Sequence, residues 1–257
     1  MIQSTRLLEG FLLTLLSCSH ADRPFFALVI GIDSDAEGFE GHIAEADDIT
    51  DFLATDLGIS PDHIVTLRNE DATRTKILKH IEDLANDVRI MRNDPILIYF
   101  SGVASNSNLH GYQGTGLPDD EVNISARDFN SLLEKLHDSK GNNIVRLSTI
   151  IFPSHSKYFL FQTVILDCPY SGDFGKGCEF SAPKPYVLLA AGERAEGKHT
   201  RYPYRGFFTP ILTTALRGLG PLITAFTYQD LVRLLNTEFR YVQLFRSCKQ
   251  CLILVPS

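Results

Sequence analysis

Apolar runs and helical spacings alternate along most of the chain. Continuous apolar runs, typical of strands that are covered on both faces, lie at 25–32, 64–67, 95–100, 163–166 and 186–190. Apolar residues at helical spacing occur over 44–57, 73–88, 125–136, 209–216 and 228–235. This alternation predicts an α/β fold, a mostly parallel sheet of about six strands with helices on both faces.

Local signals support the boundaries of these elements. Thr73 can cap the second helix, and Ser125 with Asp128 resembles a capping box at the start of the third. Gly58 is a helix stop, and Pro95 occupies the first position of its strand, where proline is tolerated. The segment 101–123 is polar and rich in glycine, which predicts a loop.

Composition and charge narrow the possible classes. The chain has 257 residues, 44% hydrophobic and 21% charged, which suits one α/β domain of generous size or two small ones. The net charge is −7 without a notable Lys/Arg cluster, so nucleic acid is not an expected partner. Five scattered cysteines are not a disulfide framework.

No cofactor or metal is expected from the motifs. Cys248-x-x-Cys251 has no second Cys/His pair to complete a tetrahedral zinc site. Gly111-x-x-Gly114-x-Gly116 has the wrong order for a dinucleotide loop, and no helix opens directly after it. The acids at 119–121 are interpreted as a solvated face rather than a calcium site.

The first 22 residues form a leader or amphipathic segment. The leucine-rich run after Arg6 followed by small residues near Ala21 resembles a short signal peptide, but Glu9 interrupts the run. We therefore expect a cytoplasmic protein, with secretion as the alternative. No stretch reaches the roughly 18 apolar residues of a spanning helix, so no membrane span is expected.

Two six-residue stretches carry the candidate chemistry. The stretch 99–104 reads Tyr-Phe-Ser-Gly-Val-Ala and the stretch 167–172 reads Asp-Cys-Pro-Tyr-Ser-Gly. Each follows a predicted buried strand. Residues just past such strand ends form the ligand crevice of a parallel sheet.

The chain resembles the caspase-like cysteine peptidases, especially the fungal metacaspase-type domains. The similarity runs from about Arg23 to about Leu235. It is carried by 26–33, Gly41 with Ala46-Asp47, 62–73, 94–102, 164–168, 187–191 and 206–209. The resemblance implies a caspase-like fold and a cysteine-type endopeptidase that acts in proteolysis and apoptosis on peptide or protein substrates.

The residues at the catalytic positions of the family argue against its reaction. The family writes the two stretches as Tyr-(Ala/Ser)-Gly-His-Gly and Asp-x-Cys-His-Ser-Gly, which places Val103 at the general base and Pro169 at the nucleophile. Valine does not titrate, and proline has neither a thiol nor a backbone N–H for an oxyanion. We therefore expect a pseudo-peptidase that acts by binding, for example by pairing with an active family relative.

The alternative is an active endopeptidase that works through Cys168, the nearest thiol, and cleaves after basic residues. Cys168 lies one residue early, so its side chain should point to the other face of the strand and be structural. His110 is the one histidine expected near the crevice. The resemblance implies acidic residues in the substrate pocket, for which Asp33 and Asp167 are candidates; solvated or helix-capping carboxylates are the competing interpretation.

The segment 145–162 looks like an insertion in a domain that spans 23–240. Without these 18 residues, Val103 and Pro169 would be 48 rather than 66 positions apart, near the spacing of about 50 in caspase-type enzymes. Codons for its ends can form splice sites, so a retained intron is one interpretation and a genuine insertion the other. The tail at 241–257 also diverges from the family. Together with the insertion, this divergence adds a third functional hypothesis to the pseudo-peptidase and the active endopeptidase, namely a non-functional gene-model product.

Overall fold

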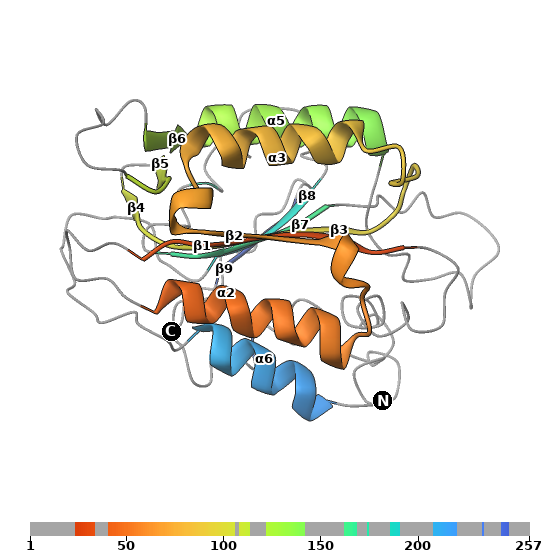
Figure 1. The fold of residues 1–257 in the computed structure, drawn as a ribbon, viewed down its shortest axis with the longest axis vertical. Coiled ribbons are helices and arrows are strands. Elements are labelled where there is room, and N and C mark those ends of the chain that lie inside the picture. The colour runs from red at the N-terminus through yellow and green to blue at the C-terminus, as the bar shows by residue number, and fades with distance from the viewer. Residues whose placement is uncertain are drawn as a thin grey trace, which may run out of the picture.

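A central sheet lies between two pairs of helices (Figure 1). The computed structural model describes residues 24–33, 41–105, 108–113, 122–141, 162–168, 174, 186–190, 208–219, 233 and 243–246. The strands of the sheet are β1 (Phe26–Gly31), β2 (Ile64–Arg68), β3 (Ile96–Ser101), β7 (Gln162–Asp167), β8 (Tyr186–Ala190) and β9 (Gln243–Arg246). Helices α3 (Arg74–Asn86) and α5 (Ala126–Lys140) cover one face, and α2 (His42–Asp51) and α6 (Phe208–Leu219) cover the other.

The strand order is β2-β1-β3-β7-β8-β9. The first five strands are parallel to one another, and β9 pairs antiparallel with β8. The predicted α/β class and the mostly parallel sheet are thus confirmed. Strand β9 lies inside the segment 241–257 that sequence reasoning set apart as a tail, so part of that segment extends the same sheet.

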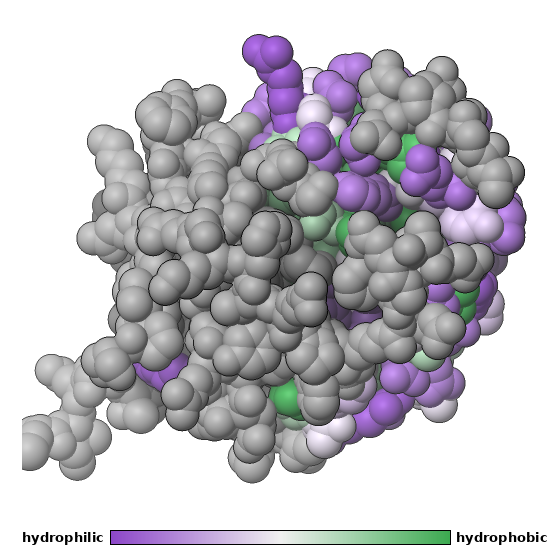
Figure 2. All heavy atoms as spheres, turned by 90° about the vertical axis from the view of Figure 1, so that its left-hand side faces the viewer, coloured by the Kyte–Doolittle hydropathy of each residue, from purple (hydrophilic) through white to green (hydrophobic). Residues whose placement is uncertain are grey.

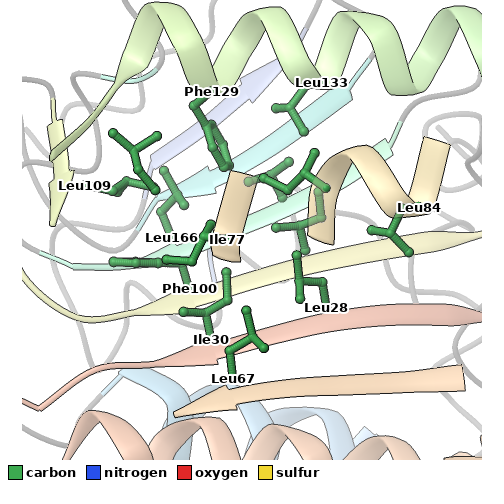
Figure 3. Close-up of a cluster of buried hydrophobic side chains, with 14 of the residues drawn as sticks. Leu28, Ile30, Leu67, Ile77, Leu84, Phe100, Leu109, Phe129, Leu133 and Leu166 are labelled. Carbon is green, nitrogen blue, oxygen red and sulfur yellow. The ribbon is translucent and has the colours of Figure 1, made fainter. Parts of the chain in front are cut away.

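Side chains of the central strands alternate between the two faces. Leu28, Ile30 and Phe100 point to the side of α3 and α5, where they join the main hydrophobic core. Figure 3 shows this core, with residues of β1, β3 and β7 beneath Ile77 and Leu84 of α3 and Phe129 and Leu133 of α5. Because these strands are buried on both faces, they read as continuous apolar runs rather than alternating ones.

On the opposite face, α2 lies unusually close to the end of β1. A Cβ atom built on Gly31 would lie 2.6 Å from Ala46 Cβ and 2.7 Å from the backbone oxygen of His42. The absence of a side chain at Gly31 therefore lets the first turns of α2 rest directly on the strand.

The helix ends follow the sequence signals. Thr73 Oγ1 accepts a hydrogen bond from Lys76 N, and Ser125 Oγ accepts one from Asp128 N at 3.0 Å, so both predicted caps are present. Helix α2 continues into a π-helical turn, η1 (Phe52–Asp56), before Gly58, which has a φ of +65°. Short 3₁₀ turns at η2 (Pro61–His63) and η3 (Asn69–Asp71) flank β2.

The segment 101–123 was predicted as a loop, but it contains a small antiparallel sheet. Its strands are β4 (Ala104–Ser105), β5 (Asn108–His110) and β6 (Asn123–Ser125), in that order. Strands of two or three residues are too short to show an alternating pattern, which is why the polar composition concealed them.

Several expectations fall outside the described residues. They concern the leader 1–22, the insertion 145–162 except Gln162, the tail 241–257 except β9, which includes the pair Cys248 and Cys251 among its undescribed residues, and the predicted helix 228–235 except Arg233. In the part of the chain that the structure describes, no helix is both long enough and apolar enough to cross a membrane.

Substitution of Gly31 tests the close approach of α2. We expect Gly31→Ala to lower the free energy of unfolding by about 1–3 kcal/mol, because the new methyl group overlaps Ala46 and the His42 carbonyl. Urea denaturation followed by circular dichroism measures the effect, and Ala46→Gly in the same background should recover part of it. Ala44→Leu on the exposed side of α2 is the matched control and should change stability by less than about 0.5 kcal/mol.

Candidate functional site

A buried polar cluster lies at the carboxyl ends of β3 and β7, on the face that α2 and α6 cover. Ser101 and Asp167 are register partners at the last positions of these two strands. Helix α2 contributes His42 and Glu45 from its first turn, and α6 contributes Thr209 from its first turn. All five residues are buried. Figure 2 views the molecule from this edge, where most of the coloured surface is hydrophilic with small hydrophobic areas between.

The half of the cluster on α2 is built around Ser101. The Ser101 hydroxyl donates a short hydrogen bond to Glu45 Oε2. His42 Nδ1 lies 2.8 Å from Ser101 Oγ and 3.3 Å from Glu45 Oε2. A serine, a histidine and a carboxylate therefore meet, but Ser101 is completely buried and both the hydroxyl and the carboxylate face the same ring nitrogen. This is not the relay of a hydrolytic triad, in which the acid holds the other ring nitrogen.

The half of the cluster on α6 is built around Asp167. Thr209 Oγ1 donates to Asp167 Oδ2 at 2.7 Å, and the backbone N–H of Thr209 donates to the same carboxylate. The Tyr99 hydroxyl lies 2.5 Å from Thr209 Oγ1 and 3.5 Å from Asp167 Oδ2. Asp167 therefore receives its bonds from neutral donors.

Burial and nearby negative charge raise the pKa values of Asp167 and Tyr99. Burial, with the Glu45 carboxylate as the next cause, raises the pKa of Asp167 well above its ordinary value, and the bonds from Thr209 and Tyr99 oppose the rise. Burial, followed by the nearby carboxylates of Asp167 and Glu45, also raises the pKa of Tyr99. Asp167 therefore keeps its proton to a higher pH than an exposed aspartate does.

Asp33, one of the two predicted pocket carboxylates, caps α2. Its Oδ1 accepts hydrogen bonds from the backbone N–H groups of His42 and Ile43 at 2.8 and 3.3 Å. Its own N–H donates to Asn69 Oδ1 at 3.0 Å. Asp33 thus orients the turn that carries Glu45, whereas Asp167 itself lies in the cluster.

Val103 lies just past β3, at the entrance to the small sheet. Its carbonyl oxygen accepts the N–H of His110 at 3.0 Å, and its side chain is partly exposed. His110 thus lies on β5, the strand that pairs with β4, and β4 begins directly after Val103. Pro169 lies outside the described residues, so the prediction that it replaces the nucleophile depends only on the sequence.

Cys168 points away from the polar cluster, as its place in the strand predicts. It joins Leu166 and Phe174 in the core beneath α3 and α5, whereas Asp167 faces α2 and α6. Burial, together with the Asp167 charge, raises the pKa of the Cys168 thiol well above its ordinary value. A buried neutral thiol is a poor nucleophile because the thiolate is the reactive form.

Sequence reasoning missed most of the cluster. It found Asp167 but not Glu45, His42, Ser101 or Thr209. The signal for two of them was present, because His42, Glu45, Ala46 and Ile49 form one helical stripe, and a charged residue on an apolar stripe is expected to have a buried partner. Within the described residues, no group of three or more His, Cys, Asp and Glu side chains has the arrangement of a metal site.

Comparisons with known proteins agree with this architecture. A family model described as the caspase domain, Peptidase_C14, matches residues 25–172. A crystal structure of a Geobacter sulfurreducens protein has 14% sequence identity and a TM-score of 0.55, and the similarity covers 88% of this chain and 94% of that one. At this identity the likeness concerns the fold alone. No curated protein matches the chain.

The raised pKa of Asp167 makes stability depend on pH in a defined direction. Because the pKa of Asp167 is raised on folding, the folded state holds the proton to higher pH than the unfolded state does, so stability is lost as pH rises from about 4 through the raised pKa. One such proton changes the free energy of unfolding by about 1.4 kcal/mol per pH unit. Asp167→Asn should remove this slope, as measured by urea denaturation between pH 4 and 8. Asp138→Asn, an exposed control, should keep it; equal slopes in all three proteins would contradict the assignment.

The orientation of Cys168 predicts a slow thiol. In the native protein at pH 7.5 we expect iodoacetamide to alkylate Cys168 about tenfold or more slowly than in the urea-unfolded chain, because it is buried and protonated. Mass spectrometry of the peptide that contains Cys168 separates it from the other cysteines. Equal native and unfolded rates would show an accessible, reactive thiol.

Proposed function

The chain belongs to the caspase-domain family, and from this membership we propose that it binds peptide or protein segments through a basic side chain without hydrolysing them. Among members of the family we assign it to the metacaspase type, and we propose an active relative or that relative's substrate as its partner. The observation that carries the proposal is the burial of two carboxyl groups, Glu45 and Asp167, at the carboxyl ends of the strands, in a chain whose position 103 is valine.

The loss of chemistry is supported by the residues themselves. Peptide hydrolysis in the family needs a thiolate and a base that activates it and protonates the leaving amine. Val103 has no titratable group and Pro169 has no nucleophile. Removal of the nucleophile or the base of such a unit abolishes most of the rate acceleration, and here both are missing.

The retention of binding is supported by the acids. Glu45 and Asp167 come from different elements, and the Glu45 carboxylate contributes, after burial, to the raised pKa of Asp167. A lysine or arginine side chain would relieve their repulsion, and a guanidinium offers donors to both carboxylates. We assign Asp33 a positioning role, because its carboxylate is engaged with the first amides of α2.

The competing function, an endopeptidase that uses Cys168, is disfavoured by the direction of that side chain. Cys168 lies on the opposite face of β7 from Asp167, in the apolar core. A nucleophile at Cys168 would attack a peptide bond on the α3 and α5 side of the sheet. The two acids would hold the substrate on the α2 and α6 side.

Two assays on the same preparation test the proposal. We expect no turnover of fluorogenic peptides that end in Arg or Lys, with the wild-type protein and Cys168→Ala indistinguishable. An Arg-containing peptide should bind about tenfold or more tightly than its citrulline analogue in fluorescence anisotropy, because only arginine carries the charge that the acids would pair.

The variants make this test specific. Glu45→Gln and Asp167→Asn should each remove most of the preference for arginine over citrulline. Glu82→Gln, an exposed glutamate on α3, should leave it unchanged. Turnover that depends on Cys168 would refute the loss of catalysis, and equal affinity for arginine and citrulline would refute the basic-side-chain site.

A further inference from the structure

One edge of the central sheet is open to a further strand. Strand β2 is the outermost strand, with α2 below it and α3 above it in Figure 1. Ile64, Val65 and Thr66 are partly exposed, whereas every residue of β1 and β3 is buried. Within the described residues β2 pairs with β1 alone, and its one other backbone hydrogen bond joins Ile64 N to the Pro61 carbonyl. The N–H and C=O groups on the outer side of β2 are therefore available to another strand.

The β2 edge lacks the features that usually prevent strand pairing. Native sheets protect a free edge with proline, with a charged side chain that points inward, or with a bulge. The sequence Ile-Val-Thr-Leu-Arg of β2 contains no proline and is rich in residues that favour strands. Its five residues stay in continuous register with β1, so no bulge interrupts it. Its one charged residue, Arg68, is the last of the strand and forms an ion pair with Asp47 of α2.

The apolar side chains of β2 are complementary to those of a second β2 that is antiparallel to it. A two-fold axis at Thr66 places Val65 opposite the partner's Leu67, and the symmetry repeats this pair. Both side chains lie on the face of the main hydrophobic core, where Leu67 is buried and Val65 packs against the cluster. The pairing therefore covers the partly exposed Val65 with an apolar neighbour.

The charges at the two ends of β2 favour the same arrangement. Arg68 closes the strand and Asp62 lies just before it in η2, and their side chains are 44% and 65% exposed. In the antiparallel pairing Arg68 lies opposite the partner's Ile64, next to the turn that carries the partner's Asp62. Symmetry forms this contact between opposite charges twice. A parallel pairing in register would instead place the two Arg68 side chains next to each other, where they repel.

We propose that two copies of this chain associate through antiparallel pairing of their β2 strands, centred on Thr66, into one continuous sheet. The partner is a second copy because the sequence of the strand is complementary to itself. The inference goes beyond the proposed function, since no residue of this edge belongs to the polar cluster at the ends of β3 and β7. Loss of the pairing and loss of the preference for arginine are therefore separate outcomes.

Sedimentation velocity of the full chain, from about 1 to 100 µM, tests the association. We expect monomer at the low end and dimer at the high end, because one pair of short strands buries a small area. Hydrogen exchange at both concentrations needs no substitution, and the amides of residues 64–68 should exchange more slowly in the concentrated sample. Monomer at every concentration, or a dimer without this protection, would overturn the proposal.

Charge substitutions at Thr66 test the position of the two-fold axis. Thr66→Lys places two lysines opposite each other and Thr66→Glu places two glutamates, so each variant alone should remain monomeric. In an equimolar mixture lysine meets glutamate, and a heterodimer should form. Thr75→Lys, a substitution of an exposed threonine on α3, should dimerise like the wild type. Circular dichroism establishes that each variant is folded, because Thr66 also loses its hydrogen bond to Thr50.

Each result with the variants supports or overturns the pairing. A dimer that persists in both Thr66 variants lies on another surface and would overturn the assignment to β2. Monomeric variants whose mixture also stays monomeric would overturn the two-fold axis at Thr66. If neither variant folds, the hydrogen exchange of the wild-type protein decides.

Discussion

The close packing of α2 on the end of β1 is the constraint on which the polar cluster depends. Gly31 leaves no side chain between the strand and the helix, and Ala46 is the small residue that faces it. Asp33, two residues past Gly31, accepts the N–H groups of His42 and Ile43 and so sets where the helix begins. A helix held this close and in this rotation places Glu45 against Ser101 at the end of the neighbouring strand.

The cluster is stable because its donors offset the cost of burying two acids. An unpaired buried carboxylate is strongly destabilising, whereas charge-assisted hydrogen bonds recover much of the lost hydration. Ser101 donates to Glu45, and Thr209 donates to Asp167 through both its hydroxyl and its backbone N–H at the start of α6. The positive end of a helix favours a negative group at that position. The two helices on this face are therefore linked to the strand ends by polar contacts, whereas α3 and α5 are held mainly by apolar ones.

The sequence predicted the fold better than it predicted the site, for a physical reason. Buried parallel strands and amphipathic helices leave periodic patterns, so β1, β3, α3 and α5 were found with their caps at Thr73 and Ser125. Asp167 was found because it follows a strand. Glu45 and Thr209 lie in helices, and only the three-dimensional packing brings them to the same carboxyl edge. Asp33 shows the limit of position-based inference, because a residue at the correct edge uses its carboxylate for a helix cap.

The alternation of β7 places two chemically different side chains of this caspase domain on opposite faces of the sheet. Consecutive residues of a strand point to opposite faces, so Asp167 enters the polar cluster while Cys168 enters the apolar core. The two faces are stabilised by different partners, the first by Tyr99 and Thr209 and the second by Leu166 and Phe174. Valine at position 103 keeps the backbone hydrogen bond to His110, which does not depend on its side chain. The contacts that hold Asp167 therefore do not involve the side chain of Val103 or of Cys168.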